Sequence, residues 1–469
     1  MLIVPGFFVQ NFGCRATQAD GAALERQLTT QGLAAAGCAE EARIVVLNTC
    51  TVTAAADQDA RAAIRRIHRE NPDAKIMVTG CYAQRAPQEI SALPGVTWVV
   101  GNSHKHQIAE IAASQLLPNK FSAGASENAT SQNFVSLESV ALSAPAFTLV
   151  GDIFAHTELI VAPVFAGDSI TEKTRPNLKV QDGCDNRCSF CIIPSVRGQS
   201  RSMKLERVVE EANALVTAGY REVVLSGINL GRWGRDFQPQ MKFEQLVRAL
   251  LEHTGIEKFR ISSVEPMDWS DELIALVADS PRIAKHAHVP LQSGSDAILR
   301  RMHRKYRPWH YVEKIRKIRE AMPDAAIGAD IMVGFPGETD ELFEESRNFI
   351  EQLPFTYLHV FTYSSRPGTA SAAMSDQVPV HVARERNRIL REIAAEKNLA
   401  FRKKFVGQKL DVITLQTGRE NWTEALSDNY LKVRVHGQHA PNELMNVNIS
   451  EIGDDHLLST AEETCLLGT

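Results

Sequence analysis

The sequence lacks any long apolar segment. None of its hydrophobic runs approaches the roughly 18 residues that span a bilayer. The apolar start MLIVPGFFVQNFGC has neither a basic leader nor a small-residue cleavage site. We therefore expect a cytoplasmic protein without a membrane partner.

Cysteine and excess positive charge are also scarce. Eight cysteines in 469 residues are too few for a disulfide scaffold, and their patterned spacing favours metal or redox chemistry. The net charge of −5 argues against a uniformly basic nucleic-acid binder but is compatible with local basic patches. With 44% hydrophobic and 23% charged residues, the chain has the composition of a globular protein of two or three domains.

Three of the cysteines fall within eight residues, in the run Cys184-Asp-Asn-Arg-Cys188-Ser-Phe-Cys191. One loop can wrap three such thiols around one iron-sulfur cluster, whereas the bacterial ferredoxin run supplies four. No further cysteine follows until Cys465, so one iron would lack a protein ligand and could bind a small molecule through nitrogen and oxygen. The alternative is a structural zinc loop, but zinc prefers paired C-x2-C half-sites with four N or S ligands.

Short apolar runs alternate with helical patterns after this loop, which predicts βα units and a parallel sheet. Helical patterns run over residues 205–218, closed by Gly219, and over 339–352, opened by Thr339. Six units between residues 178 and 362 are too few for the eight-unit barrel of about 250 residues, so we predict a partial (β/α)6 barrel. The predicted strands are LKVQD, EVVLSG, KFRISS, HAHVPL, IGADIMVGF and TYLHVFTY.

Polar residues recur at the carboxyl ends of these strands, where such a barrel places its site. Each also has a structural alternative, since GFPGE makes a good strand-to-helix turn and SGSD a good N-cap. The residues concerned are Ser226, Gly227, Ser263, Glu265, Gln292, Ser293, Gly334 and Glu338.

A second set of cysteines lies in the amino-terminal region. Cys14, Cys50 and Cys81 each follow an apolar run and precede a helical segment. In a doubly wound parallel α/β domain all three would lie at the same carboxyl edge, where such folds bind ligands. The alternative is that they are ordinary buried core cysteines. Cys38 and Cys465 share neither context, and we interpret both as ordinary residues.

The Cys184 to Cys191 loop resembles that of the radical S-adenosylmethionine superfamily, and two sets of three cysteines on two α/β units resemble the methylthiotransferase family over most of residues 7–113 and 177–467. The resemblance implies two 4Fe-4S clusters and S-adenosylmethionine as cofactors. Cys184, Cys188 and Cys191 would carry the catalytic cluster, whose open iron chelates the amino and carboxylate groups of the cofactor. Cys14, Cys50 and Cys81 would carry an auxiliary cluster that supplies or holds the sulfur. One cofactor molecule methylates that sulfur, and a second yields the radical that abstracts hydrogen from the substrate carbon.

The same resemblance implies that several of the polar strand-end residues contact the cofactor, that tRNA is the partner, and that a reducing electron donor of the flavodoxin or ferredoxin type is needed. It leaves the sulfur source open.

Four sequence segments resemble the family branch that acts on N6-threonylcarbamoyladenosine next to the tRNA anticodon: NFGCRATQAD, VQDGCDNRCSFCIIPSVRGQSRS, ISSVEP and HVPLQSGSDAILRRMHRKY. The isopentenyladenosine branch tends to have Met-Asn where this chain has Arg15 and Ala16. A threonylcarbamoyl carboxylate suits an arginine clamp, for which Arg197 and Arg201 are candidates unless they face solvent or phosphate.

Basic stretches and a carboxy-terminal barrel could serve tRNA binding. Residues 384–404 contain eight Arg or Lys against three Glu, and residues 300–307 contain five basic residues and no acid; solvated helix faces are the alternative. Beyond residue 405, short runs such as DVITLQ and YLKVRV predict a small β-barrel that resembles the OB-like TRAM domain. Trp422 and Tyr430 would either stack on bases or pack in its core.

We therefore predict an amino-terminal methylthiotransferase domain (1–113), a linker or insertion (114–176), a radical-SAM barrel (177–400) and a TRAM-like domain (401–469). Within the second part, NKFSAGASENATSQNF is typical of a flexible linker, and FTLVGDIFAHTELIVAPVFAG is apolar enough for a strand or two. Two further functions stay open. The same chemistry could act on a ribosomal protein, or the clusters could only stabilise an RNA-binding fold.

Overall fold

The computed structural model describes residues 6–116, 146–155, 174–417, 421–460 and 465–466. The chain divides into two compact units, which we describe separately. The first unit comprises residues 1–163 and 192–199, and the second comprises residues 164–191 and 200–469. The chain thus passes from the second unit into the first directly after Cys191 and returns at Ser200. Within the described residues, no helix is both long and apolar enough to cross a membrane.

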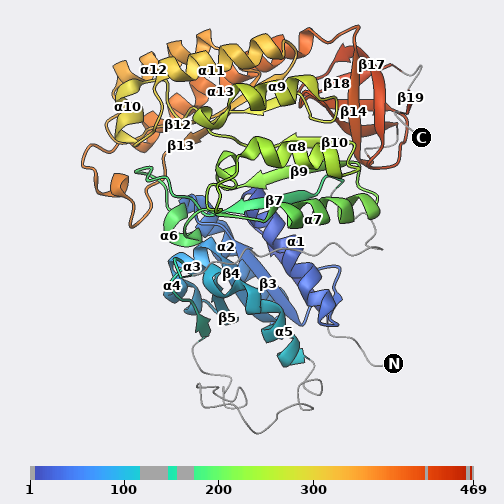
Figure 1. Ribbon diagram of the computed structural model, residues 1–469. Helices are drawn as coiled ribbons and strands as arrows, with labels where there is room; N and C mark the ends of the chain where they lie inside the picture. Colours follow the sequence, from blue (N-terminus) through green and yellow to red (C-terminus); the bar gives the residue numbers. More distant parts are fainter. Residues whose placement is uncertain (1–5, 117–145, 156–173, 418–420, 461–464, 467–469) are drawn as a thin grey trace. The chain divides into compact units, whose positions relative to one another are not determined.

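The first unit is built on a parallel sheet with the strand order β2-β1-β3-β4-β5-β6 (Figure 1). Its strands are β1 (Gly6–Asn11), β2 (Ala34–Ala35), β3 (Ile44–Thr49), β4 (Lys75–Gly80), β5 (Val96–Gly101) and β6 (Phe147–Leu149). Its helices are α1 (Arg15–Thr30), α2 (Ala54–Glu70), α3 (Cys81–Arg85), α4 (Pro87–Ser91), α5 (Ile108–Leu116) and α6 (Ile193–Arg197).

Helices cover both faces of this sheet. Along β3, Ile44 and Val46 pack with residues of α1 and α5, whereas Val45 and Leu47 pack with residues of α2, α3 and α4. Because successive side chains of a strand point to opposite faces, a strand buried on both sides is a continuous apolar run. The predicted doubly wound parallel domain is confirmed.

The apolar run FTLVGDIFAHTELIVAPVFAG contributes β6, which pairs in parallel with β5 at the edge of the sheet. A strand was predicted here, and residues 147–149 form it. The predicted flexible linker NKFSAGASENATSQNF lies outside the described residues.

The second unit contains the predicted partial barrel. One sheet has the order β10-β9-β7-β8 and another the order β11-β12-β13. The isolated parallel bridges Phe259↔Ile283 and Ser263↔His288 link the β10 region of the first of these sheets to the β11 region of the second. All the strands predicted for the barrel are present. They are β7 (Asn177–Asp182), β9 (Glu222–Gly227), β10 (Lys258–Ile261), β11 (His286–His288), β12 (Ala326–Val333) and β13 (Tyr357–Thr362), with the short β8 (Arg201–Ser202) at one edge.

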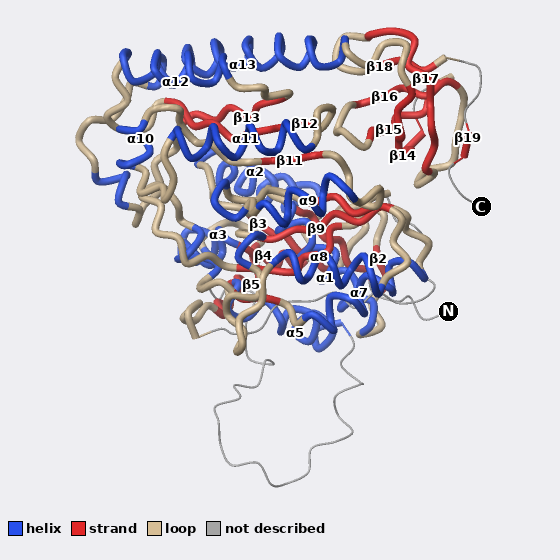
Figure 2. The backbone as a smooth tube through the Cα atoms, turned by 45° about the horizontal axis from the view of Figure 1, so that its top comes forward, coloured by secondary structure: helices blue, strands red, loops and turns tan. Residues whose placement is uncertain are grey.

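Helices connect the barrel strands, with the boundaries that their flanking residues dictate. Gly219 follows α7 with φ +88°, a conformation that glycine adopts without a Cβ penalty. Thr339 precedes α12, and its side chain accepts a hydrogen bond from the Leu342 amide at 3.3 Å, as an N-cap does. The helices are α7 (Leu205–Thr217), α8 (Phe243–His253), α9 (Asp271–Asp279), α10 (Asp296–Arg301), α11 (Pro308–Ala321), α12 (Asp340–Gln352) and α13 (Val380–Lys403). Helices α12 and α13 pack against each other (Figure 2).

The carboxy-terminal strands of the second unit close into a small barrel, as predicted. Strand β14 pairs with β15 on one side and with β17 on the other, which closes the sheet. Phe401 and Phe405, at the end of α13 and just beyond it, pack into its core. The strands are β14 (Lys409–Thr417), β15 (Trp422–Ser427), β16 (Lys432–His436), β17 (Leu444–Ile452), β18 (Leu457–Ser459) and β19 (Cys465–Leu466).

This small barrel packs on the partial barrel of the second unit through Tyr430. The Tyr430 ring stacks on His286 of β11, with ring centroids 4.4 Å apart, and lies 5.2 Å from the ring of Tyr357. Of the two roles considered for Tyr430, these contacts favour packing over base stacking. Trp422 makes an edge contact with His436 at 5.2 Å.

Candidate functional site

The amino-terminal set of cysteines, Cys14, Cys50 and Cys81, lies at the carboxyl edge of the sheet in the first unit. Cys14 precedes α1, Cys50 directly follows β3, and Cys81 begins α3 directly after β4. Strand order reverses between β1 and β3, and open α/β sheets bind ligands at such a switch point.

Close approach of the backbone brings Cys14 and Cys50 together. Gly13 has φ +95°, and a Cβ atom placed there would lie 2.8 Å from the Cys50 Sγ atom. Only glycine combines this conformation with this proximity. A side chain at position 13 would therefore displace Cys50.

The Cys50 thiol is unfavourable as a bare thiolate. Burial, together with the negative charges of the neighbouring Cys81 and Cys14 thiolates, raises the pKa of Cys50 to about 12. Iron cations would reverse this balance, because a metal-bound thiol is deprotonated. Three neighbouring thiols are a donor set that fits an iron-sulfur cluster.

Polar groups surround these thiols. Asn102 donates to the Cys81 Sγ atom at 3.7 Å and to the Val196 carbonyl at 2.8 Å. Ile192 and Val196, which flank or lie in α6, pack against Cys81. The Thr17 hydroxyl lies 3.5 Å from the Cys14 Sγ atom.

Arg197, a candidate carboxylate clamp, is 2% exposed in the first unit. Its guanidinium pairs with Asp20 at 3.2 Å, and Lys105 pairs with the same carboxylate oxygen at 3.0 Å. Arg197 therefore does not face solvent, and its positive charge lowers the pKa of Cys50 against the larger effects that raise it.

The other set of cysteines, from Cys184 to Cys191, lies in the loop that follows β7 in the second unit. Cys184, Cys188 and Cys191 are all half-buried, and the Cys191 amide donates to the Cys188 carbonyl at 3.1 Å, which tightens the loop. This loop was predicted at a strand end, and β7 ends at Asp182.

Two side chains from other βα units donate to these sulfurs. The Asn229 amide donates to Cys184 Sγ at 3.5 Å, and the Arg304 guanidinium donates to Cys188 Sγ at 3.3 Å. Burial raises the pKa of Cys184 even though hydrogen bonds from Asn186 and Asn229 lower it. Such donors stabilise the thiolate form that an iron-sulfur cluster requires.

Glu265 lies next to this loop. Its carboxylate binds Arg304, the same residue that contacts Cys188. Together with Asn186, Cys188 and Arg304, Glu265 lines a narrow pocket that is partly open to solvent. A second cavity shares Asn186 and contains Asn229. Small-molecule sites are concave and carry a few converging polar groups, which both cavities provide beside the cysteines.

The residues predicted at the end of β9 pack against β7, the strand that precedes this loop. Ser226 is 1% exposed, and its hydroxyl donates to the Leu178 carbonyl at 3.4 Å. A Cβ atom on Gly227 would lie 3.0 Å from the Gln181 side-chain oxygen. That same oxygen accepts the Asn229 amide hydrogen at 2.7 Å. Glycine at 227 thus permits the packing that places Asn229.

Three further residues predicted to contact the cofactor, Gln292, Ser293 and Ser263, lie just beyond the ends of barrel strands. Gln292 has φ +68° and exchanges backbone hydrogen bonds with Asp330 and Met332. Ser293 is buried, and its hydroxyl accepts from the Ser295 amide at 3.2 Å. Ser263 bridges to His288.

Glu338 has structural partners. Its carboxylate accepts the Gly334 amide hydrogen at 2.6 Å and pairs with Arg386 of α13 at 2.8 Å. These contacts close the strand-to-helix turn, which is the alternative role of the GFPGE run. That Gly334 and Glu338 contact the cofactor stays a prediction.

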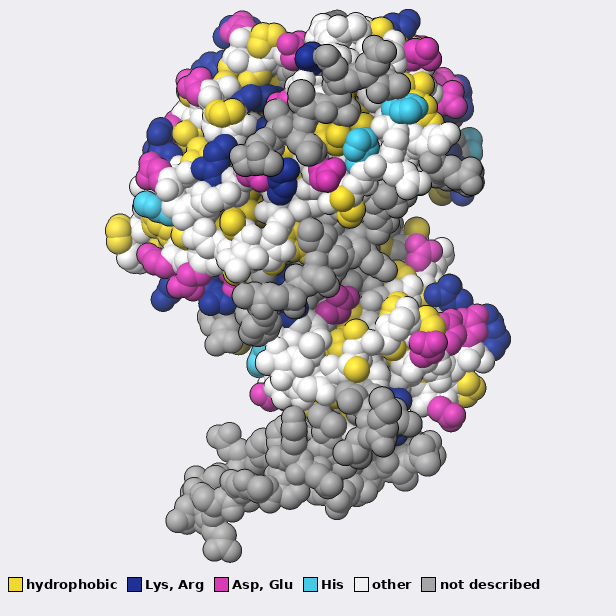
Figure 3. Space-filling model, turned by 90° about the vertical axis from the view of Figure 1, so that its right-hand side faces the viewer, with side chains coloured by type: hydrophobic (Ala, Val, Ile, Leu, Met, Phe, Trp, Pro, Cys, Tyr) yellow, Lys and Arg dark blue, Asp and Glu magenta, His cyan; other side chains and the backbone are white. Residues whose placement is uncertain are grey.

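Most cations of the basic stretches are engaged within the chain. Arg304 is 7% exposed, Arg301 pairs with Asp376 at 2.6 Å, and Arg388 pairs with Glu385 at 2.7 Å. Arg402 donates to three carbonyls of the β17–β18 connection. Lys and Arg side chains are interspersed with Asp and Glu over the face shown in Figure 3. The ion-paired helix face is therefore the better interpretation of these stretches.

Sequence reasoning missed Asn229, Arg304 and Asn102 as partners of the sulfur atoms. Asn229 lies two residues beyond Gly227, so the strand-end rule that selected Gly227 would also have reached it. Arg304 was counted as one charge in a basic stretch, which suggested a surface cation and not a partner of a cysteine. Nothing in the sequence near Asn102 indicates its contact with Cys81.

Two family models match the chain. The model described as "Radical SAM superfamily" matches residues 178–350. The model described as "Uncharacterized protein family UPF0004" matches residues 6–101. The first match contains Cys184, Cys188 and Cys191, and the second contains Cys14, Cys50 and Cys81.

Several curated relatives match nearly the whole chain. The "Threonylcarbamoyladenosine tRNA methylthiotransferase MtaB" of Bacillus subtilis is 37% identical, over 90% of this chain and 88% of that protein. The protein of the same name from Aquifex aeolicus is 34% identical, over 94% of this chain and 99% of that protein. A "tRNA-2-methylthio-N(6)-dimethylallyladenosine synthase" from Thermobifida fusca is also 34% identical, over 87% of this chain and 77% of that protein.

Among solved structures, the radical S-adenosylmethionine methyltransferase TsrM from Kitasatospora setae, with cobalamin and a [4Fe-4S] cluster bound, superposes with a TM-score of 0.54. The match covers 79% of this chain and 74% of that chain at 16% identity. At this identity the likeness concerns the fold.

Proposed function

Because the chain belongs to the radical S-adenosylmethionine methylthiotransferase family, we propose that it converts N6-threonylcarbamoyladenosine next to the tRNA anticodon to its 2-methylthio derivative. The enzyme is a transferase of the radical S-adenosylmethionine type. The observation that carries the proposal is the pair of three-cysteine sets, each at the carboxyl edge of its own parallel sheet.

The cofactors are S-adenosylmethionine and 4Fe-4S clusters. In our proposal, Cys184, Cys188 and Cys191 hold the catalytic cluster in the second unit. When bound there, the cluster supplies the electron that cleaves S-adenosylmethionine. Asn229 and Arg304 stabilise the thiolates through their hydrogen bonds.

The two cavities beside this loop offer polar contacts to the cofactor. Glu265 lies where its carboxylate can accept from an ammonium group, and Asn186 and Asn229 offer amide contacts. Ser226, Gln292 and Ser293 complete the proposed set, together with Gly227, Ser263, Gly334 and Glu338.

Cys14, Cys50 and Cys81 hold the auxiliary cluster in the first unit. Gly13 permits the close approach of the chain before Cys14 to Cys50, and the Asn102 amide supports Cys81. The substrate is tRNA, and the enzyme takes electrons from a reducing donor. We further propose a donor of the flavodoxin or ferredoxin type and a cytoplasmic setting, as expected for a tRNA-modifying enzyme.

Two observations support the threonylcarbamoyladenosine branch over the isopentenyladenosine branch. The Bacillus subtilis relative named threonylcarbamoyladenosine tRNA methylthiotransferase is 37% identical to the chain, and the Thermobifida fusca relative named dimethylallyladenosine synthase is 34% identical. Arg15 and Ala16 stand where the isopentenyladenosine branch tends to have Met-Asn.

The proposal is tested with purified enzyme carrying reconstituted clusters, reductant and S-adenosylmethionine. One tRNA substrate carries N6-threonylcarbamoyladenosine and the other carries isopentenyladenosine. We expect 5′-deoxyadenosine formation and methylthio product on the first tRNA. Cys188→Ala should abolish both, whereas Cys38→Ala, a cysteine outside both sets, should retain both. Product on the isopentenyladenosine substrate alone would overturn the branch assignment, and cofactor cleavage by Cys188→Ala would overturn the cluster assignment.

A further inference from the structure

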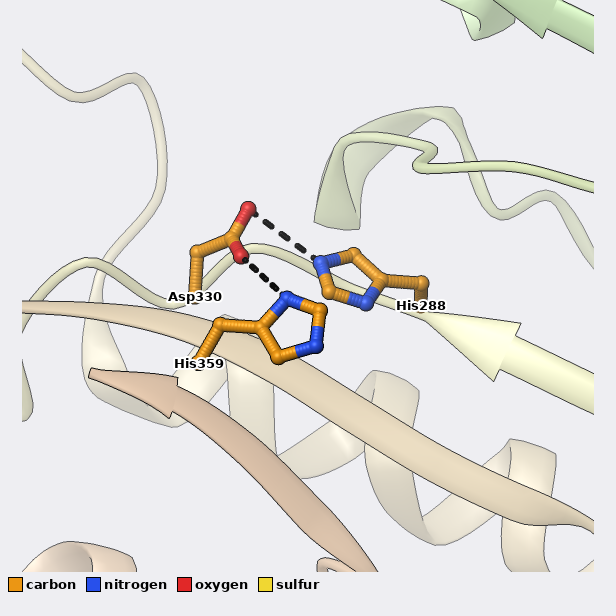
Figure 4. Close-up of side chains that lie close together, drawn as sticks. All are labelled: His288, Asp330 and His359. Atoms are coloured by element: carbon orange, nitrogen blue, oxygen red, sulfur yellow. Dashed lines mark ion pairs between the residues drawn. The ribbon is translucent and has the colours of Figure 1, made fainter. Parts of the chain in front are cut away.

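Three side chains of types that can bind metal ions meet on adjacent strands of the second unit. His288 ends β11, Asp330 lies in β12, and His359 lies in β13. Asp330 and His359 are register partners of the parallel β12–β13 pair. Figure 4 shows the two imidazoles side by side, each turned toward a different oxygen of the Asp330 carboxylate.

The distances suit a shared ion. The His288 Nε2 atom lies 3.2 Å from Asp330 Oδ2, and the His359 Nδ1 atom lies 3.5 Å from Asp330 Oδ1. One ligand atom from each residue lies within 4.8 Å of the others. Tetrahedral zinc with bonds of about 2.0–2.2 Å holds its ligand atoms roughly 3.3–3.5 Å apart. The side chains therefore need little movement to bind one ion.

A hydrogen-bonded partner fixes the first imidazole. The His288 Nδ1 atom shares a hydrogen bond of 2.8 Å with the Tyr357 hydroxyl, which also bonds the His286 ring at 2.7 Å. This leaves the Nε2 atom of His288 directed at Asp330. Histidine ligands of metals characteristically engage their second nitrogen in this way.

Asp330 is the shared partner of the two imidazoles. Its ion pairs within the described part of the chain are with His288 and His359, not with Lys or Arg. One carboxylate and two imidazoles therefore converge without a Lys or Arg side chain among them, which suits the binding of a cation.

We propose that His288, Asp330 and His359 bind one divalent transition-metal ion, with zinc as the expected occupant. Two imidazoles and one carboxylate form a donor set suited to zinc and its neighbours rather than to magnesium or calcium. His359 has a side chain that is 49% exposed, so solvent or an oxygen ligand can reach the remaining coordination position. A site with three protein ligands and an open position is the arrangement found where zinc binds a further ligand.

The test uses the enzyme with both clusters reconstituted, so that iron occupies the cysteines. The protein is dialysed to equilibrium against micromolar Zn²⁺, and zinc and iron are measured by elemental mass spectrometry. We expect about one zinc per chain with unchanged iron. Unchanged iron shows that zinc has not displaced iron from cysteine.

Variants separate this site from adventitious binding. His359→Ala, on an exposed side chain, and Asp330→Asn should each weaken zinc binding at least tenfold with iron retained. Tyr357→Phe, which leaves the three ligands in place, should weaken it about tenfold. The matched control is His253→Ala, because His253 is an exposed histidine on α8, and it should bind zinc as the parent does. Absence of stoichiometric zinc in the parent, or equal zinc in the parent and both ligand variants, would overturn the site.

Discussion

The Arg304 guanidinium donates a hydrogen bond to the Cys188 Sγ atom across 3.3 Å. Burial lowers the pKa of Arg304, but charge interactions with Tyr306, Glu265 and Cys188 outweigh it, and the pKa is raised well above its ordinary value. Arg304 therefore remains a cation beside a cysteine that we assign to the catalytic cluster. Hydrogen bonds and charge near cluster sulfurs set the reduction potential.

Arg304→Met should make the catalytic cluster harder to reduce. Loss of a charge-assisted hydrogen bond of about 1.5–3 kcal/mol to the reduced, more negative form should lower the midpoint potential by roughly 60 mV or more, since 59 mV is tenfold for one electron. Reductive cleavage of S-adenosylmethionine should slow accordingly. The potential is measured by redox titration followed by electron paramagnetic resonance.

Arg300→Met serves as the control for this prediction, because Arg300 is exposed and pairs with Asp296. An unchanged potential in Arg304→Met, with cluster content retained, would show that the contact with Cys188 does not tune the cluster.

Gly13→Ala should remove the auxiliary cluster and leave the catalytic one. The new Cβ atom would lie 2.5 Å from the Cys50 Cβ atom at a backbone φ of +95°, so Cys50 must move. We expect roughly half of the iron, continued formation of 5′-deoxyadenosine, and no methylthio product. Iron analysis and product assays on the same preparation check all three.

The control is Gly37→Ala in the same unit, where the nearest atom to an added Cβ is the Glu41 Oε2 atom at 3.7 Å. A Gly13→Ala enzyme with full iron content and full methylthio transfer would contradict the assigned role of Cys50.

Glu222→Gln should destabilise the second unit. Arg260 of β10 pairs with Glu222 at 2.8 Å and donates to the Ser427 and Asp428 carbonyls of the small barrel at 3.1 and 3.0 Å. Removing the carboxylate leaves a buried guanidinium without its counter-charge, which costs about 3–5 kcal/mol. The free energy of unfolding is measured by urea titration at pH 7.

The same pair predicts a pH dependence. Burial raises the pKa of Glu222, but the charges of Arg260 and Arg175 outweigh it, so the folded-state pKa is lowered. A lowered carboxyl pKa contributes stability above the unfolded value of about 4.3, and this stability is lost as the pH falls through the folded value. The parent should therefore lose stability below about pH 4.3 more steeply than Glu222→Gln.

The control is Glu257→Gln, because Glu257 is an exposed partner of Arg221. This variant should change the free energy of unfolding by less than about 1 kcal/mol. Parallel pH profiles for the parent and Glu222→Gln would contradict the account.

The strands and the cysteines were the most predictable parts of this protein. A parallel strand such as β3 is buried on both faces and reads as an uninterrupted apolar run. The two cysteine sets were recognisable because local spacing identifies one of them and shared strand-end context identifies the other. Helix ends at Gly219 and Thr339 followed from capping chemistry.

Side-chain contacts between residues far apart in the sequence could not be predicted from local spacing or capping residues. Charge counting treated Arg304 and Arg386 as surface cations, whereas Glu265 and Glu338 bind them in buried positions. His288, Asp330 and His359 meet only because β11, β12 and β13 are neighbours. Their spacing along the chain follows the lengths of the intervening helices and carries no ligand signature.

The most direct test of the central claim is mass spectrometry of tRNA nucleosides from cells that lack this protein, with and without its restoration. The account predicts that 2-methylthio-N6-threonylcarbamoyladenosine disappears and its precursor accumulates. Restoring the parent protein should bring the nucleoside back, and restoring Cys188→Ala should not. An unchanged level of this nucleoside in the cells that lack the protein would contradict the proposed function.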